Sequence, residues 1–171
     1  MMSVKKAVFP VAGLGTRFRP VTSVVPKEML PVVDKPLIDY AIEEAVDAGI
    51  TDLIFVVSPD KHIIVKYLSD KGNIEAIFEG KENENEASRL NIEFVFQNEP
   101  LGLGHAVLCA QEVVGADPFA VLLPDDLVVS EVSCLAQMVI NMGRLAEILS
   151  QWSRWSPSKR ICMECLKSMN T

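Results

Sequence analysis

The chain has 171 residues, of which 49% are hydrophobic and 23% are charged, and its formal net charge at pH 7 is -7. This length fits one globular domain, because domains most often contain roughly 100 to 150 residues. The apolar stretches fall short of the roughly 20 residues that a membrane-spanning helix needs, so we expect no membrane association. The negative net charge argues against nucleic acid as a partner.

The N-terminal residues and the cysteines indicate the cellular compartment. Two lysines precede an apolar run that Pro10 and Gly13 interrupt, and this run is too short for the core of a signal peptide. We therefore expect a cytoplasmic location, and we expect the four cysteines to carry reduced thiols. Cys162 and Cys165 form a single C-x-x-C pair, which supplies only half of a structural zinc site.

The first part of the chain shows a strand, helix, strand, helix pattern. Lys5–Ala12 is an apolar, β-prone run that ends in a glycine-rich turn and predicts a buried strand. Pro36–Ala48 carries apolar residues at helical spacing, and Gly49 follows as a C-cap. Asp52–Ser58 predicts a second buried strand, and Lys61–Leu68 fits a short helix. These segments predict a β-α-β unit.

The pattern continues after a polar interruption. Lys81–Ser88 has no apolar periodicity and predicts an exposed loop, whereas Asn91–Gln97 alternates like a strand. His105–Val114 predicts a helix, and Pro118–Pro124 predicts another buried strand. The fold class is therefore α/β, with a Rossmann-like, open and mostly parallel sheet whose ligands bind outside the carboxyl ends of its strands.

Two segments near the first strand fit phosphate binding. In Gly13–Arg17 the glycines allow backbone N–H groups to approach a phosphate, although a plain tight turn is the more common explanation of a bare G-x-G. Phe18 replaces the third glycine of the dinucleotide fingerprint, and no Gly-Lys-Ser/Thr follows, so NAD and P-loop sites are disfavoured. Three prolines in Pro26–Pro36 predict a stiffened loop around Lys27, which by itself would be a solvated lysine. A basic pocket is conceivable from five nearby residues, Lys5, Lys6, Arg17, Arg19 and Lys27.

The order of these segments resembles the sugar-1-phosphate nucleotidylyltransferases, and in particular their bacterial UTP–glucose-1-phosphate members. The resemblance runs from about Lys5 to about Met138. Four blocks carry it: Pro10–Arg17 with Pro20, Pro26–Pro31 with Asp34–Pro36, Gln97 with Pro100–Val107, and Leu122–Asp126. It implies a sheet of the nucleotidyltransferase, glycosyltransferase-A-like type.

The resemblance also implies a reaction. In this family a sugar-1-phosphate oxygen attacks the α-phosphate of a nucleoside triphosphate with Mg²⁺ as cofactor, and pyrophosphate leaves. UTP and glucose 1-phosphate would be the substrates and UDP-glucose the product. By resemblance, Arg17 would hold the pyrophosphate and Lys27 would neutralise charge on the α-phosphate. The triphosphate would lie on a loop formed by Ala12, Gly13, Leu14, Gly15 and Thr16.

The remaining site residues follow later strands. Gln97 and Gly102 resemble the positions where the family reads the pyrimidine, with uracil favoured. Asp125 resembles the aspartate that binds Mg²⁺, which needs only one or two protein carboxylates, and Asp126 is interpreted as its neighbour only. Without the earlier blocks this acidic pair would be an ordinary strand-end turn. His105 is interpreted as a turn or helix-start residue, because nothing nearby in the sequence gives it a partner.

The last residues depart from the family pattern. Residues 1–138 are predicted to be the nucleotide-binding part, and residues 139–171 an atypical tail that holds both tryptophans, Trp152 and Trp155. Codons exist for Arg160–Thr171 that spell a family-like string when read one nucleotide out of frame, which motivates the hypothesis of a frameshift. Family members are longer, so we expect a sheet that is incomplete at its C-terminal end. The alternatives are an inactive nucleotide-binding fragment, a relative using another sugar phosphate or nucleotide, and an interaction module built on the tail. Full-length members can form homo-oligomers.

Overall fold

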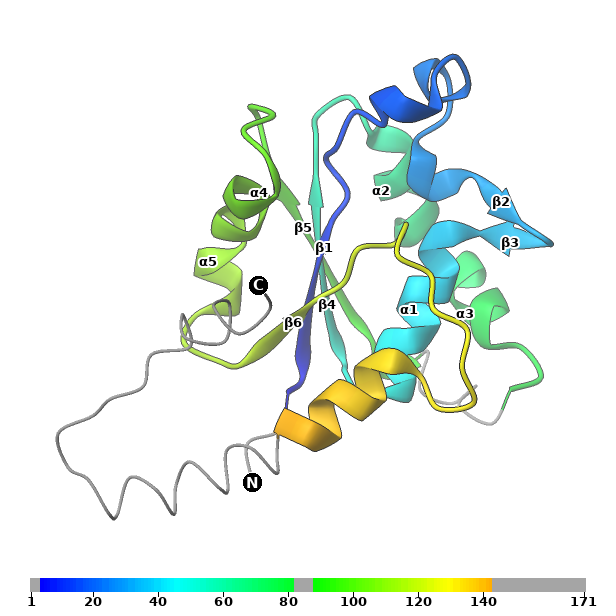
Figure 1. Ribbon diagram of the computed structural model, residues 1–171, viewed down its shortest axis with the longest axis vertical. Coiled ribbons are helices and arrows are strands. Elements are labelled where there is room, and N and C mark those ends of the chain that lie inside the picture. Colours follow the sequence, from blue (N-terminus) through cyan, green and yellow to red (C-terminus); the bar gives the residue numbers. More distant parts are fainter. Residues whose placement is uncertain (1–3, 82–87, 143–171) are drawn as a thin grey trace, which may run out of the picture.

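A computed structural model of the chain describes residues 4–81 and 88–142. Its centre is a four-stranded sheet in the order β5-β4-β1-β6, in which every pairing is parallel (Figure 1). The strands are β1 (Lys6–Pro10), β4 (Asp52–Val57), β5 (Asn91–Phe96) and β6 (Phe119–Val121). The prediction of an open, mostly parallel α/β sheet is confirmed. Within the described ranges, β6 pairs only with β1.

Helices cover both faces of the sheet (Figure 1). One face packs against α1 (Leu37–Asp47), α2 (His62–Ser69), α3 (Lys71–Phe78) and a helix at residues 134–142. The other face packs against α4 (Leu103–Cys109) and α5 (Gln111–Val114). No helix in the described part of the chain is long and apolar enough to cross a bilayer.

Alternating side chains of the central strands enter two separate cores. Phe9 and Phe55 stack with ring centroids 4.6 Å apart in the core beneath α1. Their neighbours Val8 and Ile54 face α4 and pack with Ala106. Because both faces are buried, the strands are continuously apolar, which is why their sequences were recognisable.

Most elements lie within one or two residues of their predicted bounds, but three differ. The helix predicted over His105–Val114 begins earlier and is interrupted at Ala110, which gives α4 and α5. The strand predicted over Pro118–Pro124 has only three paired residues, because its register with β1 ends at Val8 and Val121. Helix α3 was not predicted; the Asp70 side chain caps it by accepting from the Gly72 N–H at 3.0 Å. Most of the predicted loop Lys81–Ser88 lies outside the described residues.

The proline-rich segment between β1 and α1 is more structured than a stiff loop. A 3-10 turn at Lys27–Met29 leads into a small antiparallel hairpin of β2 (Pro31–Val32) and β3 (Lys35–Pro36). Its turn contains Val33 at φ 63°. The Tyr40 hydroxyl of α1 donates to the Val32 carbonyl at 2.7 Å and ties the hairpin to the helix. The prediction of a stiffened loop therefore missed this hairpin.

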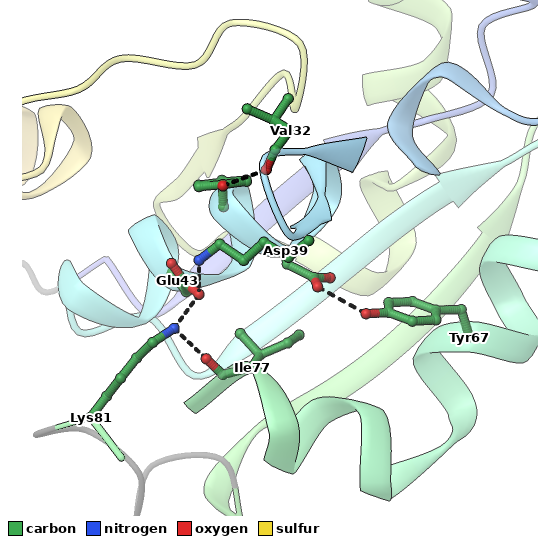
Figure 2. A network of polar contacts seen from close by, with 8 residues as sticks. Val32, Asp39, Glu43, Tyr67, Ile77 and Lys81 are labelled. Carbon is green, nitrogen blue, oxygen red and sulfur yellow. Dashed lines mark hydrogen bonds and ion pairs between the residues drawn. The ribbon is translucent and has the colours of Figure 1, made fainter. Parts of the chain in front are cut away.

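A polar network lies behind this hairpin, between α1, α2 and α3 (Figure 2). The ammonium groups of Lys35 and Lys81 both pair with Glu43. The Tyr67 hydroxyl donates to Asp39 Oδ2 at 2.8 Å, and the other oxygen of Asp39 is buried without a partner. Burial raises the pKa of Asp39 from 3.8 to about 6, although the hydrogen bond from Tyr67 acts in the opposite direction.

We expect Asp39→Asn to stabilise the protein increasingly as pH rises. The folded state holds the Asp39 proton up to a higher pH than the unfolded state does, so the wild type loses stability between about pH 4 and about pH 6. Asparagine keeps an acceptor for Tyr67 and carries no charge. Relative to the wild type, its free energy of unfolding should increase by about 3 kcal/mol across this range and then stay level.

Urea unfolding at pH 4, 5, 6, 7 and 8 measures the difference. The exposed neighbour Asp34, changed to asparagine, is the control, and a difference independent of pH would contradict the prediction.

Candidate functional site

A cleft of about 410 Å³ opens at the carboxyl ends of the strands, where segments following β1, β5 and β6 meet. This is where an open α/β sheet binds its ligands. Nine of the ten residues predicted for the site line it: Ala12, Gly13, Leu14, Gly15, Thr16, Lys27, Gln97, Gly102 and Asp125. They come from positions 12 to 125 in the sequence. The parallel strands therefore bring the predicted blocks into one place.

The tenth predicted residue and part of the predicted basic pocket lie elsewhere. Arg17 sits on a 3-10 turn (Thr16–Phe18), follows the cleft-lining residue Thr16, and is exposed rather than lining the cleft. Lys5 precedes β1 and Lys6 is its first residue, so the length of that strand separates both lysines from the loop at its other end. Lys5 donates to the Gly49 carbonyl at 2.9 Å, and Lys6 donates to the Val114 carbonyl at 3.0 Å. Including Lys5 and Lys6 in a basic pocket was wrong.

The loop after β1 is shaped by Gly15 and Thr22. Gly15 has φ 61°, and a Cβ at this position would lie 3.1 Å from a methyl group of Thr22. The Thr22 hydroxyl donates to the Gly15 carbonyl at 2.6 Å and fixes the loop. The backbone N–H groups of residues 13–15 donate to no other described residue. They are available to phosphate oxygens, as in other loops of successive N–H groups.

A lysine and an aspartate face each other beside this loop. Lys27 Nζ lies 2.7 Å from Asp125 Oδ2, although the two residues are 98 positions apart. Partial burial acts to raise the pKa of Asp125, but the hydrogen bond and charge of Lys27 outweigh it and hold this pKa below 3.8. Asp125 is therefore a carboxylate at neutral pH. Asp126 lines a different cavity, with Ala41 and Leu135, which agrees with its interpretation as a neighbour only.

The donor set at Asp125 fits magnesium rather than zinc. The described residues contain no group of three or more histidine, cysteine or acidic side chains that could enclose a metal. Mg²⁺ keeps several waters and is commonly held by one or two carboxylates together with substrate phosphates. One ionised carboxylate next to a loop with free N–H groups matches that requirement. Cys162 and Cys165 lie outside the described residues.

A buried ion pair that was not predicted lies next to the residues that line the cleft. Lys61 Nζ donates to Glu28 Oε2 at 2.8 Å and to the Val11 carbonyl at 2.7 Å. Glu28 is 1% exposed and Lys61 is 8% exposed. Burial raises the pKa of Glu28 and lowers that of Lys61, and the attraction between the two opposes both shifts. Lys61 therefore links Val11, which precedes Ala12, to Glu28, which follows Lys27.

The base-reading residues of the predicted site are held together by a histidine. Gln97 is 5% exposed, and its Nε2 donates to the Gly102 carbonyl at 3.2 Å. The same nitrogen lies 2.9 Å from His105 Nδ1. Gly102 has φ 95°, a value that favours glycine. The expectation that His105 has no nearby partner was wrong: His105 lies in the first turns of α4, and its ring contacts Gln97, the residue that follows β5.

An open parallel sheet with an N–H-rich loop, a lysine and a carboxylate at its carboxyl edge is typical of nucleotide-binding α/β proteins. The sequence model of the nucleotidyl transferase family matches residues 6–153. The chain belongs to this family. The match extends beyond residue 138, into the start of the segment predicted to be an atypical tail, and residues 134–142 are helical.

Individual relatives show which members of the family the chain resembles. The chain is 48% identical over 146 residues to the UTP–glucose-1-phosphate uridylyltransferase YngB of Bacillus subtilis, covering 80% of this chain and 48% of the relative. A second B. subtilis UTP–glucose-1-phosphate uridylyltransferase is 48% identical over 149 residues, covering 81% of this chain and 50% of the relative. The chain therefore spans about half the length of these relatives.

Solved structures give the same result. A UDP-glucose pyrophosphorylase complexed with UDP-glucose matches with a TM-score of 0.71 and 39% identity, over 84% of this chain and 55% of the other. The UTP-bound UGPase from Acinetobacter baumannii matches with a TM-score of 0.69 and 44% identity, over 82% and 53%. The family and fold expected from the sequence are confirmed.

Proposed function

We propose that this chain binds UTP in the cleft and acts in the transfer of its uridylyl group to glucose 1-phosphate, which forms UDP-glucose and pyrophosphate. The observation that carries the proposal is the convergence of nine predicted site residues on one cleft. The names of the relatives and the UTP bound to the A. baumannii structure support the choice of substrate.

The cleft residues suit an in-line displacement at phosphorus. An oxygen of the glucose 1-phosphate attacks the α-phosphorus of UTP, and the bond from that phosphorus to the bridging β-phosphate oxygen breaks. The electron pair of this bond leaves with the pyrophosphate. The N–H groups of residues 13–15 would bind the triphosphate oxygens, and Lys27 would stabilise the negative charge that builds at the α-phosphate. The protein's task is thus positioning and charge stabilisation.

Magnesium belongs to the same proposal. Asp125 would hold Mg²⁺ with the phosphates, and the metal would offset their charge and orient them. Asp125 now pairs with Lys27, so this lysine would exchange its carboxylate partner for a phosphate when the nucleotide binds. Arg17 would have to turn into the cleft from its exposed position to hold pyrophosphate. A cytoplasmic location, where UTP is available, is part of this proposal.

Nucleotide binding and turnover can be measured separately on the 171-residue chain. We expect isothermal titration calorimetry to detect UTP binding that strengthens with Mg²⁺, and we expect Asp125→Asn to remove that dependence on Mg²⁺. A coupled assay then measures pyrophosphate release from UTP and glucose 1-phosphate. Asp126→Asn is the matched control. Binding without release would assign the chain as a nucleotide-binding protein that lacks transfer activity. Absence of both would overturn the proposal.

A further inference from the structure

The side-chain amide of Gln97 is anchored on one side only. Gln97 follows β5, and its backbone N–H donates to the Val57 carbonyl at 2.8 Å. Its Nε2 contacts both the Gly102 carbonyl oxygen, at 3.2 Å, and His105 Nδ1, at 2.9 Å. Its Oε1 accepts no hydrogen bond from any other described residue, and the side chain lines the cleft.

These two contacts determine which half of the amide faces the cleft. A carboxamide has two donor hydrogens on nitrogen and an acceptor oxygen, so a half-turn exchanges donor for acceptor. The Gly102 carbonyl can only accept. His105 Nδ1 accepts when the ring proton is on Nε2. With the ring proton of His105 on Nε2, turning the amide would place Oε1 against two acceptors, and the oxygen is then held on the side away from Gly102 and His105.

The ring of His105 is itself supported by α4. The Cys109 sulfur, one turn further along, lies 3.9 Å from each ring nitrogen. His105 is half-buried, so its ring has neighbours on the helix side and Gln97 on the strand side. Gly102 is the N-cap residue of α4, and its carbonyl also accepts from the Ala106 N–H at 3.1 Å, so this helix positions both acceptors.

We propose that His105 is a positioning residue that determines which pyrimidine the cleft accepts. It holds the Gln97 oxygen towards the base, and an acceptor in that position favours uracil, whose ring N3 carries a hydrogen, over cytosine, whose N3 does not. This inference rests on the proposed function, because it requires a nucleotide in this cleft. A site built to bond a particular hydrogen rejects the base that lacks it, since a polar group is then left unpaired.

The test compares dissociation constants for UTP and CTP, measured by calorimetry on the full chain. His105→Leu removes the acceptor at similar size, whereas His105→Asn keeps an acceptor close to the position of Nδ1. We expect leucine to lower the preference for UTP over CTP by roughly tenfold or more, and asparagine to retain most of it. Leu108→Ala, at an exposed position of the same helix, should leave the preference unchanged.

The outcomes separate the inference from the proposed function. If the wild type prefers UTP and His105→Leu weakens UTP and CTP binding equally, the role of His105 is only structural and the inference is wrong. If the wild type binds neither nucleotide, the proposed function fails first.

A measurement without nucleotide tests the geometry independently, even if His105→Leu does not fold. Nitrogen-15 NMR of the wild type should show His105 with its proton on Nε2 and a Gln97 amide group that responds to His105→Asn. A proton on Nδ1 would overturn the inference whatever the binding results.

Discussion

Lys27→Met is expected to lower the rate of pyrophosphate formation by about 10²- to 10³-fold, the usual cost of removing one group that stabilises charge in a transition state. Lys27 is the basic side chain that lines the cleft beside the N–H-rich loop, and its ammonium lies 2.7 Å from Asp125. Methionine has a similar length and no charge. Because the charge on the α-phosphate is greatest in the transition state, the loss should appear mainly in kcat rather than in KM.

The control for Lys27→Met is the same substitution at Lys66, an exposed residue of α2 outside the cleft. Lys66→Met should leave kcat unchanged within about twofold, since surface substitutions rarely matter. A Lys27→Met protein with normal kcat and raised KM would show that Lys27 binds ground state and transition state equally. If both kcat and KM of Lys27→Met were normal, Lys27 would have no role in the reaction.

Features that depend on local patterns could be predicted from the sequence. The continuous apolar run around Phe55 identifies a buried strand, and the helical spacing of its apolar residues identifies α1. Gly13, Lys27 and Asp125 were placed in one site because each belongs to a recognisable block. The structure adds the physical reason: β1, β5 and β6 belong to one parallel sheet, so the segments that follow them lie along the same edge.

Features that depend on long-range packing could not be predicted. Glu28 and Lys61 are 33 residues apart in the sequence. Each is a residue type that is mostly exposed, so the sequence alone would place either of them on the surface. The contact between Gln97 and His105 requires the turn at Gly102, whose positive φ is set by the loop as a whole. Arg17 was assigned from its block alone, but the 3-10 turn directs it outward.

The Glu28–Lys61 pair explains how the cleft keeps its shape. Lys27 and Glu28 are consecutive, so the anchoring of Glu28 on Lys61 restricts where the backbone of Lys27 can lie. Lys61 also holds the Val11 carbonyl, directly before the residues that line the cleft. One buried ammonium group therefore fixes the relative positions of the loop and of the lysine that faces Asp125.

Lys61→Met should consequently destabilise the fold by about 3–5 kcal/mol at pH 7, because it leaves the buried carboxylate of Glu28 without its partner. Burial already raises the pKa of Glu28, and without the opposing charge of Lys61 this pKa should rise further. The folded variant then keeps the Glu28 proton to a higher pH than the unfolded chain does. Its stability, relative to the wild type, should therefore be greatest at low pH and fall as pH rises from about 4.5 to 7. Urea unfolding at these two pH values measures the loss.

The double variant Glu28→Leu with Lys61→Met distinguishes a lost ion pair from a lost contact with Val11. Replacing both charges with apolar side chains removes the unpaired carboxylate, so the double variant should be more stable at pH 7 than Lys61→Met alone. Its remaining deficit relative to the wild type then measures the Val11 carbonyl that has lost its donor. Lys66→Met, the exposed control, should change stability by less than about 0.5 kcal/mol. If the double variant were as unstable as the single one and both showed the same pH dependence, Glu28 would not be the group that requires Lys61.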